Sequence, residues 1–249
     1  MMENKMFCYQ CQETVGNQGC SQVGVCGKTP ETAGLQDLLI DVTKGLAEVI
    51  NEVRCKGKEI NNVYDDQVSE NLFITITNAN FDDQMIIEAV RKTLTLKKEL
   101  LLQLDDQAVL SNRALWMEMD IEAIEKRMQM VGVLETADED IRSLKQLITY
   151  GLKGMAAYNK HAHALGFRKD EIDRFIETTL VKIETSTMSL NDYVALTMET
   201  GKYGVQVMEL LDQANTSTYG NPEITEVNIG VRNNPGILVS GHDLKDLEM

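Results

Sequence analysis

The stretch KTPETAGLQDLLIDVTKGLAEVINEV, residues 28–53, decides the fold class of this chain. Thr29 followed by Pro30 has the form of a helix start, because threonine is a favoured N-cap and proline is tolerated at the first helical position. Apolar residues then recur at three- and four-residue steps, at Leu35, Leu38, Leu39, Val42, Leu46, Val49, Ile50 and Val53. This spacing predicts one long helix with a single apolar face that packs into a core.

The same patterns predict further helices along most of the chain. We expect them at about residues 69–78, from the break NANFDD (78–83) to about 104, at 120–130, from 138 onward, at 169–184 and at 190–214. The chain has only 3 prolines among 249 residues, and 5% of its residues are aromatic, which suits a mainly α fold. Residues 1–220 are therefore expected to form one domain, in which a cysteine-rich loop precedes helices packed on helices.

The pattern changes after residue 214. Residues 215–223, NTSTYGNPE, have the composition of a linker. Alternating Val227, Ile229 and Val231 predict a strand, and ILV at 237–239 predicts a second strand that leads through SGHD into a helix. These elements predict that residues 221–249 begin an α/β, Rossmann-like domain. A strand without sheet partners is not stable alone, so we expect the chain to be a truncated part of a longer protein.

The formal charge of the chain is −15, from 24 Lys plus Arg and 39 Asp plus Glu. This acidic balance argues against nonspecific binding to nucleic acid or to anionic membranes, both of which attract basic surfaces. No apolar run approaches the roughly 20 residues of a membrane-spanning helix, and the start MMENKMFCYQC lacks the apolar region of a signal peptide. We therefore expect a cytoplasmic protein whose thiols remain reduced.

Four cysteines lie close together near the start of the chain. Cys8, Cys11, Cys20 and Cys26 have the spacing C-x2-C-x8-C-x5-C, and glycines at positions 16, 19, 24 and 27 would let the loop wrap around a metal centre. Four thiolates suit a structural zinc ion and a cubane [4Fe–4S] cluster equally well, so the spacing alone leaves both open. Disulfides are not expected in a large cytosolic chain. Cys55, far along the chain, is interpreted as a bystander.

Other candidate ligands have simpler interpretations. His161 and His163 are two residues apart and so do not share a helix face, which disfavours joint metal binding and favours partly exposed helix positions. The residues Trp116, Met117, Met119, Met128 and Met130 are interpreted as packing residues rather than as a cofactor site.

Two distant motifs together resemble one known family. MFCYQCQET…GC…GVCGKTPETA near the start and NNPGILVSGHDLKDLE at the end are similar to the hybrid cluster protein, or prismane, family. TITNANFD and NKHAHALG also resemble segments of that family. The resemblance runs from about Met6 to the end of the chain and is highly specific at both ends.

The resemblance implies a fold, cofactors and an activity. It implies a helical first domain followed by α/β domains, with Cys8, Cys11, Cys20 and Cys26 as ligands of a [4Fe–4S] cluster. The histidine of GHDL, His242, would be one ligand of the family's iron–sulfur–oxygen hybrid cluster. The other hybrid-cluster ligands of the family are further cysteines and glutamates, and no cysteine follows Cys55 here. This chain is therefore not expected to complete that cluster.

The resemblance implies reduction of hydroxylamine to ammonia, and of nitric oxide, with electrons that reach the protein through its N-terminal cluster. A redox donor protein and a small nitrogenous substrate would then be its partners. Because most hybrid-cluster ligands are missing, we expect this chain alone to be inactive. Two other interpretations remain open, namely a single-cluster electron carrier and a zinc-stabilised helical scaffold without enzymatic activity.

Overall fold

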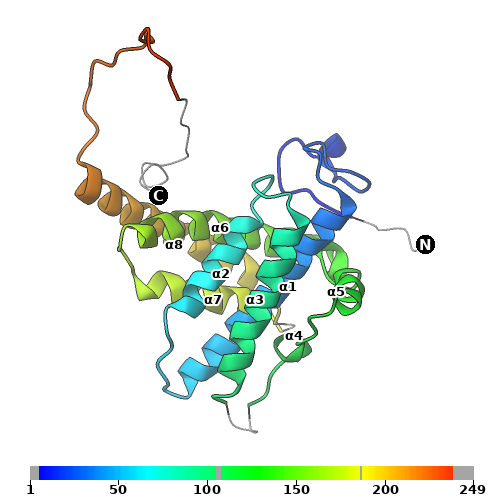
Figure 1. Ribbon diagram of the computed structural model, residues 1–249. Helices are drawn as coiled ribbons and strands as arrows, with labels where there is room; N and C mark the ends of the chain where they lie inside the picture. The colour runs from blue at the N-terminus through cyan, green and yellow to red at the C-terminus, as the bar shows by residue number, and fades with distance from the viewer. Residues whose placement is uncertain (1–5, 105–107, 186, 238–249) are drawn as a thin grey trace.

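The computed structural model describes residues 6–104, 108–185 and 187–237, which contain eight α-helices, two short 3-10 helices and no strand (Figure 1). The α-helices are α1 (Pro30–Cys55), α2 (Val63–Ile74), α3 (Asp83–Leu101), α4 (Asn112–Leu115), α5 (Ile121–Met128), α6 (Glu139–Ala164), α7 (Asp170–Lys182) and α8 (Leu190–Tyr219). The 3-10 helices are η1 (Val15–Asn17) and η2 (Val133–Glu135). The mainly α prediction is thus confirmed.

Helix α1 is the central helix of the fold and packs against α2, α3, α4, α5 and α7. It begins as the sequence predicts, because the Thr29 side chain accepts a hydrogen bond of 3.1 Å from the backbone N–H of Thr32. All eight residues of its predicted apolar stripe are buried. Side chains of Asp82, Asp120, Asp138 and Ser189 cap α3, α5, α6 and α8 in the same way, which explains why these helix starts are legible in the sequence.

The apolar stripe of α1 serves two adjoining cores. Its first half, including Leu38 and Val42, packs with residues of α3 and α5 such as Leu94 and Ile124. Its second half, including Leu46, packs with residues of α2, α6, α7 and α8. The most extensive helix pairings are α6 with α8 and α1 with α3. One helix therefore links both halves of the body.

Buried charges attach the short helices α4 and α5 to α1 and α3. Asp41 is 4% exposed, and its carboxylate pairs with Arg113 of α4 and with Arg127 of α5. The fully buried Lys97 donates hydrogen bonds to the backbone carbonyls of Arg113 (3.0 Å) and Trp116 (2.8 Å). Helix α4 was absent from the sequence prediction, because these partners lie far away in the chain.

Three sequence predictions need correction. Helix α2 begins at Val63 rather than near residue 69, because it buries polar residues such as Gln67 and Asn71 and shows no clear apolar stripe. Helix α8 continues through the predicted linker to Tyr219 and ends at Gly220, which has φ = 87°. Residues 220–237 contain no strand, and the side chain of Ile229 is 96% exposed.

The predicted strand at 227–231 lacks a partner within the part of the chain that the structure describes, and unpaired strands do not persist in water. The start of an α/β domain is therefore not observed, and most of the second predicted strand, at 237–239, lies outside the described residues. Figure 1 shows the segment running away from the body beyond the end of α8.

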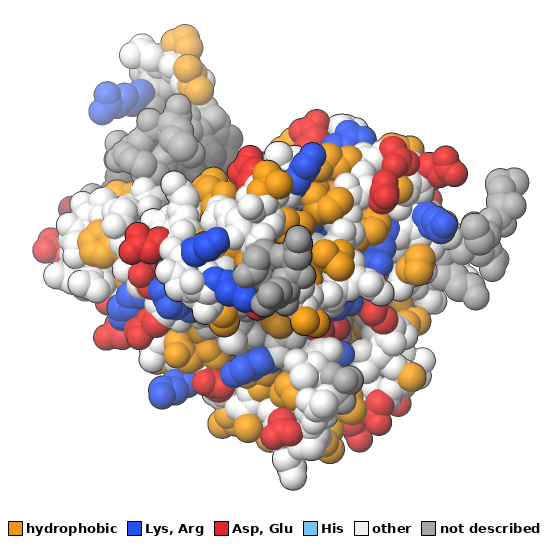
Figure 2. Space-filling view, turned by 90° about the horizontal axis from the view of Figure 1, so that it is seen from below, with side chains coloured by type: hydrophobic (Ala, Val, Ile, Leu, Met, Phe, Trp, Pro, Cys, Tyr) orange, Lys and Arg blue, Asp and Glu red, His pale blue; other side chains and the backbone are white. Residues whose placement is uncertain are grey.

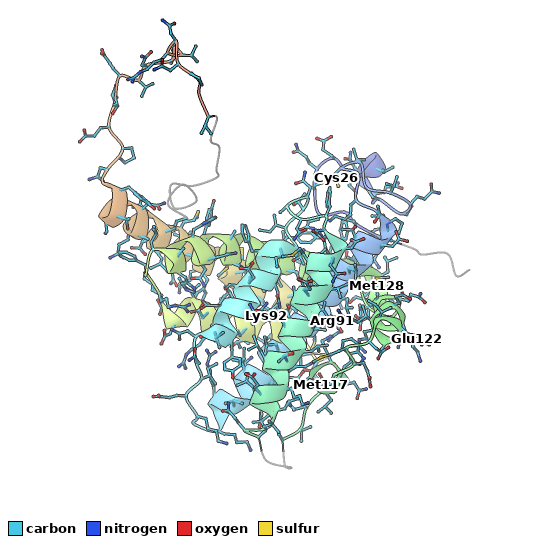
Figure 3. All side chains as sticks on the ribbon, viewed as in Figure 1. Cys26, Arg91, Lys92, Met117, Glu122 and Met128 are labelled. Carbon is cyan, nitrogen blue, oxygen red and sulfur yellow. The ribbon has the colours of Figure 1, made fainter. Side chains whose placement is uncertain are left out.

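The interpretation of Trp116 and the methionines as packing residues is largely confirmed. Trp116, Met117, Met119 and Met128 pack against the core between α1, α3 and α5. Met130 differs, since 64% of its surface is exposed. In Figure 3, Met117 and Cys26 lie towards opposite ends of the body, so Met117 is remote from the cysteine loop.

Candidate metal centre

The four N-terminal cysteines lie on one loop, residues 7–29, above the N-terminal end of α1 (Figures 1 and 3). Cys8 and Cys20 face each other in an isolated antiparallel bridge, with N–O distances of 3.0 and 2.8 Å between their backbones. The Thr14 hydroxyl donates to the Cys8 carbonyl at 3.1 Å and lies 3.7 Å from Cys20 Sγ. Backbone pairing thus brings the first and third cysteines together.

Glycines shape the loop where the sequence places them. Gly16 has φ = 59° and Gly27 has φ = 88°, which are conformations that glycine adopts without strain. Gly24 matters for space instead, because a Cβ there would lie 3.1 Å from Cys26 Sγ. At Gly19 an added Cβ would come within 2.6 Å of the Phe7 ring. The loop therefore depends on these glycines for its path around the sulfurs.

Exposure differs among the cysteines. Cys20 is buried, Cys8 and Cys11 are intermediate, and Cys26 is exposed. A hydrogen bond from the backbone N–H of Val15 lowers the pKa of the Cys20 thiol, and one from the Val25 N–H acts in the same direction. Burial acts in the opposite direction and raises this pKa. Backbone N–H groups directed at a cysteine sulfur favour the thiolate, which is the form that binds metals.

The side chain of Gln10 is one of the contacts that connect the loop to the body. Gln10, between Cys8 and Cys11, accepts hydrogen bonds at Oε1 from the backbone N–H of Thr77 (3.0 Å) and from Lys153 Nζ (3.1 Å). Lys153 lies on α6, is 3% exposed and also donates to the Thr75 carbonyl at 2.9 Å. These contacts fix the Cys8–Cys11 turn against the end of α2 and the middle of α6.

A small pocket lies between the loop and the helices. Cys8, Gln10, Lys28, Asp37, Tyr150 and Lys153 contribute to its lining. Burial raises the pKa of Asp37 to about 7, although Lys153 and Lys28 oppose this shift. Burial lowers the pKa of Lys153 to about 7, with Asp37 acting in the other direction. Two lysines and one carboxyl group therefore lie together in the pocket beside Cys8.

The donor set fits an iron–sulfur cluster in chemistry, because four thiols of one glycine-rich loop match the thiolate ligation of such clusters. Within the described residues, however, no three His, Cys, Asp or Glu side chains are grouped closely enough to hold a metal ion. The loop brings Cys8 and Cys20 together at the backbone without assembling a metal-binding group. His242 lies outside the described residues.

His161 and His163 of α6 are intermediate in exposure as whole residues, but the His163 side chain is only 8% exposed. His163 Nδ1 lies 3.1 Å from a carboxylate oxygen of Asp66, and its Nε2 lies 3.7 Å from Asp173. Burial lowers the pKa of His163. The His161 ring meets the Phe73 ring edge-on at 5.8 Å. The two imidazoles therefore have different surroundings, in agreement with their separate helix faces.

The model of the Prismane/CO dehydrogenase family matches residues 6–249, nearly the whole chain. The chain belongs to this family. Membership implies iron–sulfur clusters and confirms the resemblance drawn from the end motifs. Among the described residues, no helix combines the length and the apolar character needed to cross a membrane.

Curated members of this prismane family are similar over the whole chain. The hydroxylamine reductase of Desulfovibrio desulfuricans is 58% identical over 248 residues, which cover 100% of this chain and 46% of that protein. The hydroxylamine reductase of Clostridium perfringens is 54% identical, with 98% of this chain and 45% of that protein covered. The hydroxylamine reductase of Porphyromonas gingivalis is 51% identical, with 100% of this chain and 46% of that protein covered. The chain thus spans about half the length of the curated relatives that it matches.

The sequence did not reveal the residues that hold the cysteine loop against the helices. Gln10 could have been noticed from its place between two cysteines, but its partners Thr77 and Lys153 are 67 and 143 positions away. A lysine on an amphipathic helix is usually exposed, so nothing in the sequence of α6 marks Lys153 as buried. The residues that support the candidate site are visible only in the folded chain.

Proposed function

We propose that this chain is the electron-accepting, N-terminal part of a hydroxylamine reductase. Its cysteine loop would bind a [4Fe–4S] cluster through Cys8, Cys11, Cys20 and Cys26. The whole protein would reduce hydroxylamine to ammonia, and also nitric oxide, in the cytoplasm. The observation that carries this proposal is the four-cysteine loop of a chain that is 58% identical, over its full length, to a hydroxylamine reductase.

The loop has features that suit such a role. Cys26 is exposed, so a cofactor bound there would lie near the surface, within reach of a donor. Cys20 is buried and accepts backbone hydrogen bonds, which suits a thiolate ligand. A cluster of this kind supplies one-electron transfer when bound. The protein would control that transfer through hydrogen bonds to sulfur and through burial.

His242 completes this proposal as a ligand of the hybrid cluster in the whole protein. Imidazole is a suitable iron ligand. Cys55 is the last cysteine in the chain, so the remaining thiolate ligands would have to come from elsewhere. We therefore expect no hydroxylamine turnover by this chain alone, and methyl-viologen-coupled turnover that Cys8→Ser abolishes would contradict this expectation.

Metal analysis tests the cofactor directly. The chain is purified without oxygen, its iron, sulfide and zinc are measured, and the reduced protein is examined by EPR. We expect about four irons per chain and a cubane signal. Cys26→Ser should remove or alter the signal, whereas the control Cys55→Ser, at the exposed end of α1, should leave it unchanged. About one zinc per chain without iron would contradict the proposal and support a zinc-stabilised scaffold.

The same preparation distinguishes an electron carrier from a part of a reductase. The chain is mixed with a separately produced C-terminal half of a relative, and hydroxylamine turnover is measured. Turnover that requires both parts supports the reductase. Reversible one-electron cycling of the chain, with no turnover in any mixture, supports a carrier.

The proposed donor protein would dock at the cysteine loop. Glu13 and Lys28 are the only charged residues in the stretch 7–29, and Lys28 is buried. Figure 2 shows acidic and basic side chains interspersed on the face seen from below. The net charge of −15 nevertheless favours a donor with a basic surface. Reduction by such a donor should slow as salt increases, and a salt-independent rate would contradict this part of the proposal.

A further inference from the structure

Lys153 is an unusual residue to find in the centre of a helical body. It is 3% exposed, and its Nζ donates to two neutral oxygens, Gln10 Oε1 and the Thr75 carbonyl. The ammonium also lies 5.6 Å from the centre of the Tyr150 ring. No carboxylate of the described residues forms an ion pair with it. Its positive charge is therefore buried without a direct counter-charge.

Burying an unpaired ammonium is unfavourable, and an apolar side chain of similar length would avoid this cost. The burial of Lys153 therefore indicates that a negative charge lies near its ammonium in some states of the protein and is absent in others. Asp37, on the same pocket, acts on Lys153 only at longer range.

The cysteine loop, whose Cys8 lines the same pocket, is a place where such a charge would arise. Gln10 accepts the hydrogen bond of Lys153 and lies between Cys8 and Cys11 in the chain. Cys8 and Lys153 both line the pocket beneath the loop. Thiolate ligands carry negative charge, and an added electron increases the negative charge at the loop. When it is protonated, Lys153 places an ammonium in the pocket that Cys8 also lines, where it would stabilise both kinds of charge.

We propose that Lys153, held by Gln10, is a positioning residue that stabilises negative charge on the cysteine loop and so favours the reduced state of a cofactor bound there. Lys153 acts through its charge and through Gln10 and is not itself a ligand. The reductant supplies the electron, and no covalent bond is made or broken. This inference rests on the proposed function, because it takes the loop as the site of an iron–sulfur cluster.

The test compares the ratio of reduced to oxidised cofactor at one fixed potential near the wild-type midpoint. Lys153→Met should lower this ratio about tenfold, which is about 59 mV for one electron. Lys153→Arg keeps the charge and should stay within about twofold of the wild type. Lys160→Met is the matched control, because Lys160 is on the same helix, is partly exposed and pairs with Glu70 at the surface. An unchanged ratio in Lys153→Met with full iron content would overturn the proposal.

A second pair of variants leaves Lys153 in place and guards against a folding defect. Gln10→Glu puts a carboxylate beside the ammonium and should also lower the ratio. Gln12→Glu adds the same charge to the exposed side of the loop, where water screens it, and should have a smaller effect. Equal effects of these two variants would contradict a specific role of the contact between Gln10 and Lys153.

The outcomes separate this inference from the proposed function. Iron and sulfide content of the wild type tests the cluster, whereas the variants test Lys153. If the wild type lacks iron, Lys153 is judged in the metal-free chain by the rate of iodoacetamide reaction at Cys8, with Cys55 as the internal reference. Lys153→Met should slow the reaction at Cys8 at least about fivefold, because the thiolate is the reactive form. An unchanged rate there would overturn the inference.

Discussion

Two long segments outside the α-helices, one before α1 and one after α8, differ in how they meet the helical body. The cysteine loop, residues 7–29, follows the buried Met6, pairs with itself through Cys8 and Cys20, and is held to α2 and α6 by Gln10. The segment 220–237 has more apolar residues in alternation, yet Ile229 and Val231 are almost fully exposed. Contacts with the body, and not apolar composition, therefore separate the folded segment from the extended one.

Proteolysis should give the largest difference between the two segments. Trypsin is expected to cut after the exposed Arg232 at least about 100-fold faster than after Lys28, which is 2% exposed and donates to Gln36 at 2.7 Å. Mass spectrometry of timed digests measures both rates. Metal binding should slow cleavage at Lys28 further, because the bound metal stabilises the folded loop. Equal cleavage rates after Arg232 and after Lys28 would show that the cysteine loop is no better folded than the segment 220–237.

Removing the Gln10 side chain, which helps to anchor the loop, should have a smaller but measurable effect, a decrease in the free energy of unfolding. Gln10→Ala leaves Lys153 Nζ and the Thr77 N–H without their shared acceptor, so we expect the free energy of unfolding to fall by about 1–3 kcal/mol. Urea denaturation measures this change. The exposed Gln12 provides the control, and Gln12→Ala should remain within about 0.5 kcal/mol of the wild type.

Two glycines with nearly the same positive φ allow a matched comparison. Gly27 has φ = 88° and Gly220 has φ = 87°, and neither would meet another atom within 4 Å through an added Cβ. Gly27→Ala should lower the free energy of unfolding by about 1–2 kcal/mol, because the packed loop keeps the strained conformation. Gly220→Ala should cost less than about 0.5 kcal/mol, because the exposed chain after it can relax. A similar loss in both variants, measured by thermal denaturation, would show that residues after 220 are also held in place.

The smallest effect is expected in the exposed segment. Ile229→Ser should change the free energy of unfolding of this chain by less than about 0.5 kcal/mol, because that side chain is 96% exposed. Leu38→Ser, in the core beside α3, is the contrasting variant and should cost several kcal/mol. A large loss from Ile229→Ser would indicate that the segment packs against another part of the molecule.

Much of the helical fold could be predicted from short stretches of sequence. Thr29, Asp82, Asp120, Asp138 and Ser189 are caps that act within three residues, so each helix start is a local property. The apolar stripe of α1 is likewise local. The beginning of α2 and the whole of α4 were missed, because buried polar contacts with other helices stabilise them. Asn71, for example, donates to Thr43 of α1 and Thr93 of α3.

The candidate metal centre likewise combines features that the sequence predicts with features that only the folded structure shows. The cysteine spacing and the loop glycines are visible in the sequence, and the structure gives Gly16 and Gly27 the positive φ values that such a loop needs. The sequence indicates nothing about Lys153, because its partner Gln10 is 143 positions away. Only the packing of α6 against α2 brings that charge beneath the loop.

By itself, the sequence determined where most helices begin, which face of α1 is buried and which thiols share a loop. These properties depend on capping and periodicity over a few residues. The tertiary structure alone decided that Lys97 and Lys153 are buried and that residues 220–237 remain extended. The physical reason is that burial of a charge, like pairing of a strand, depends on partners that only the folded chain brings near.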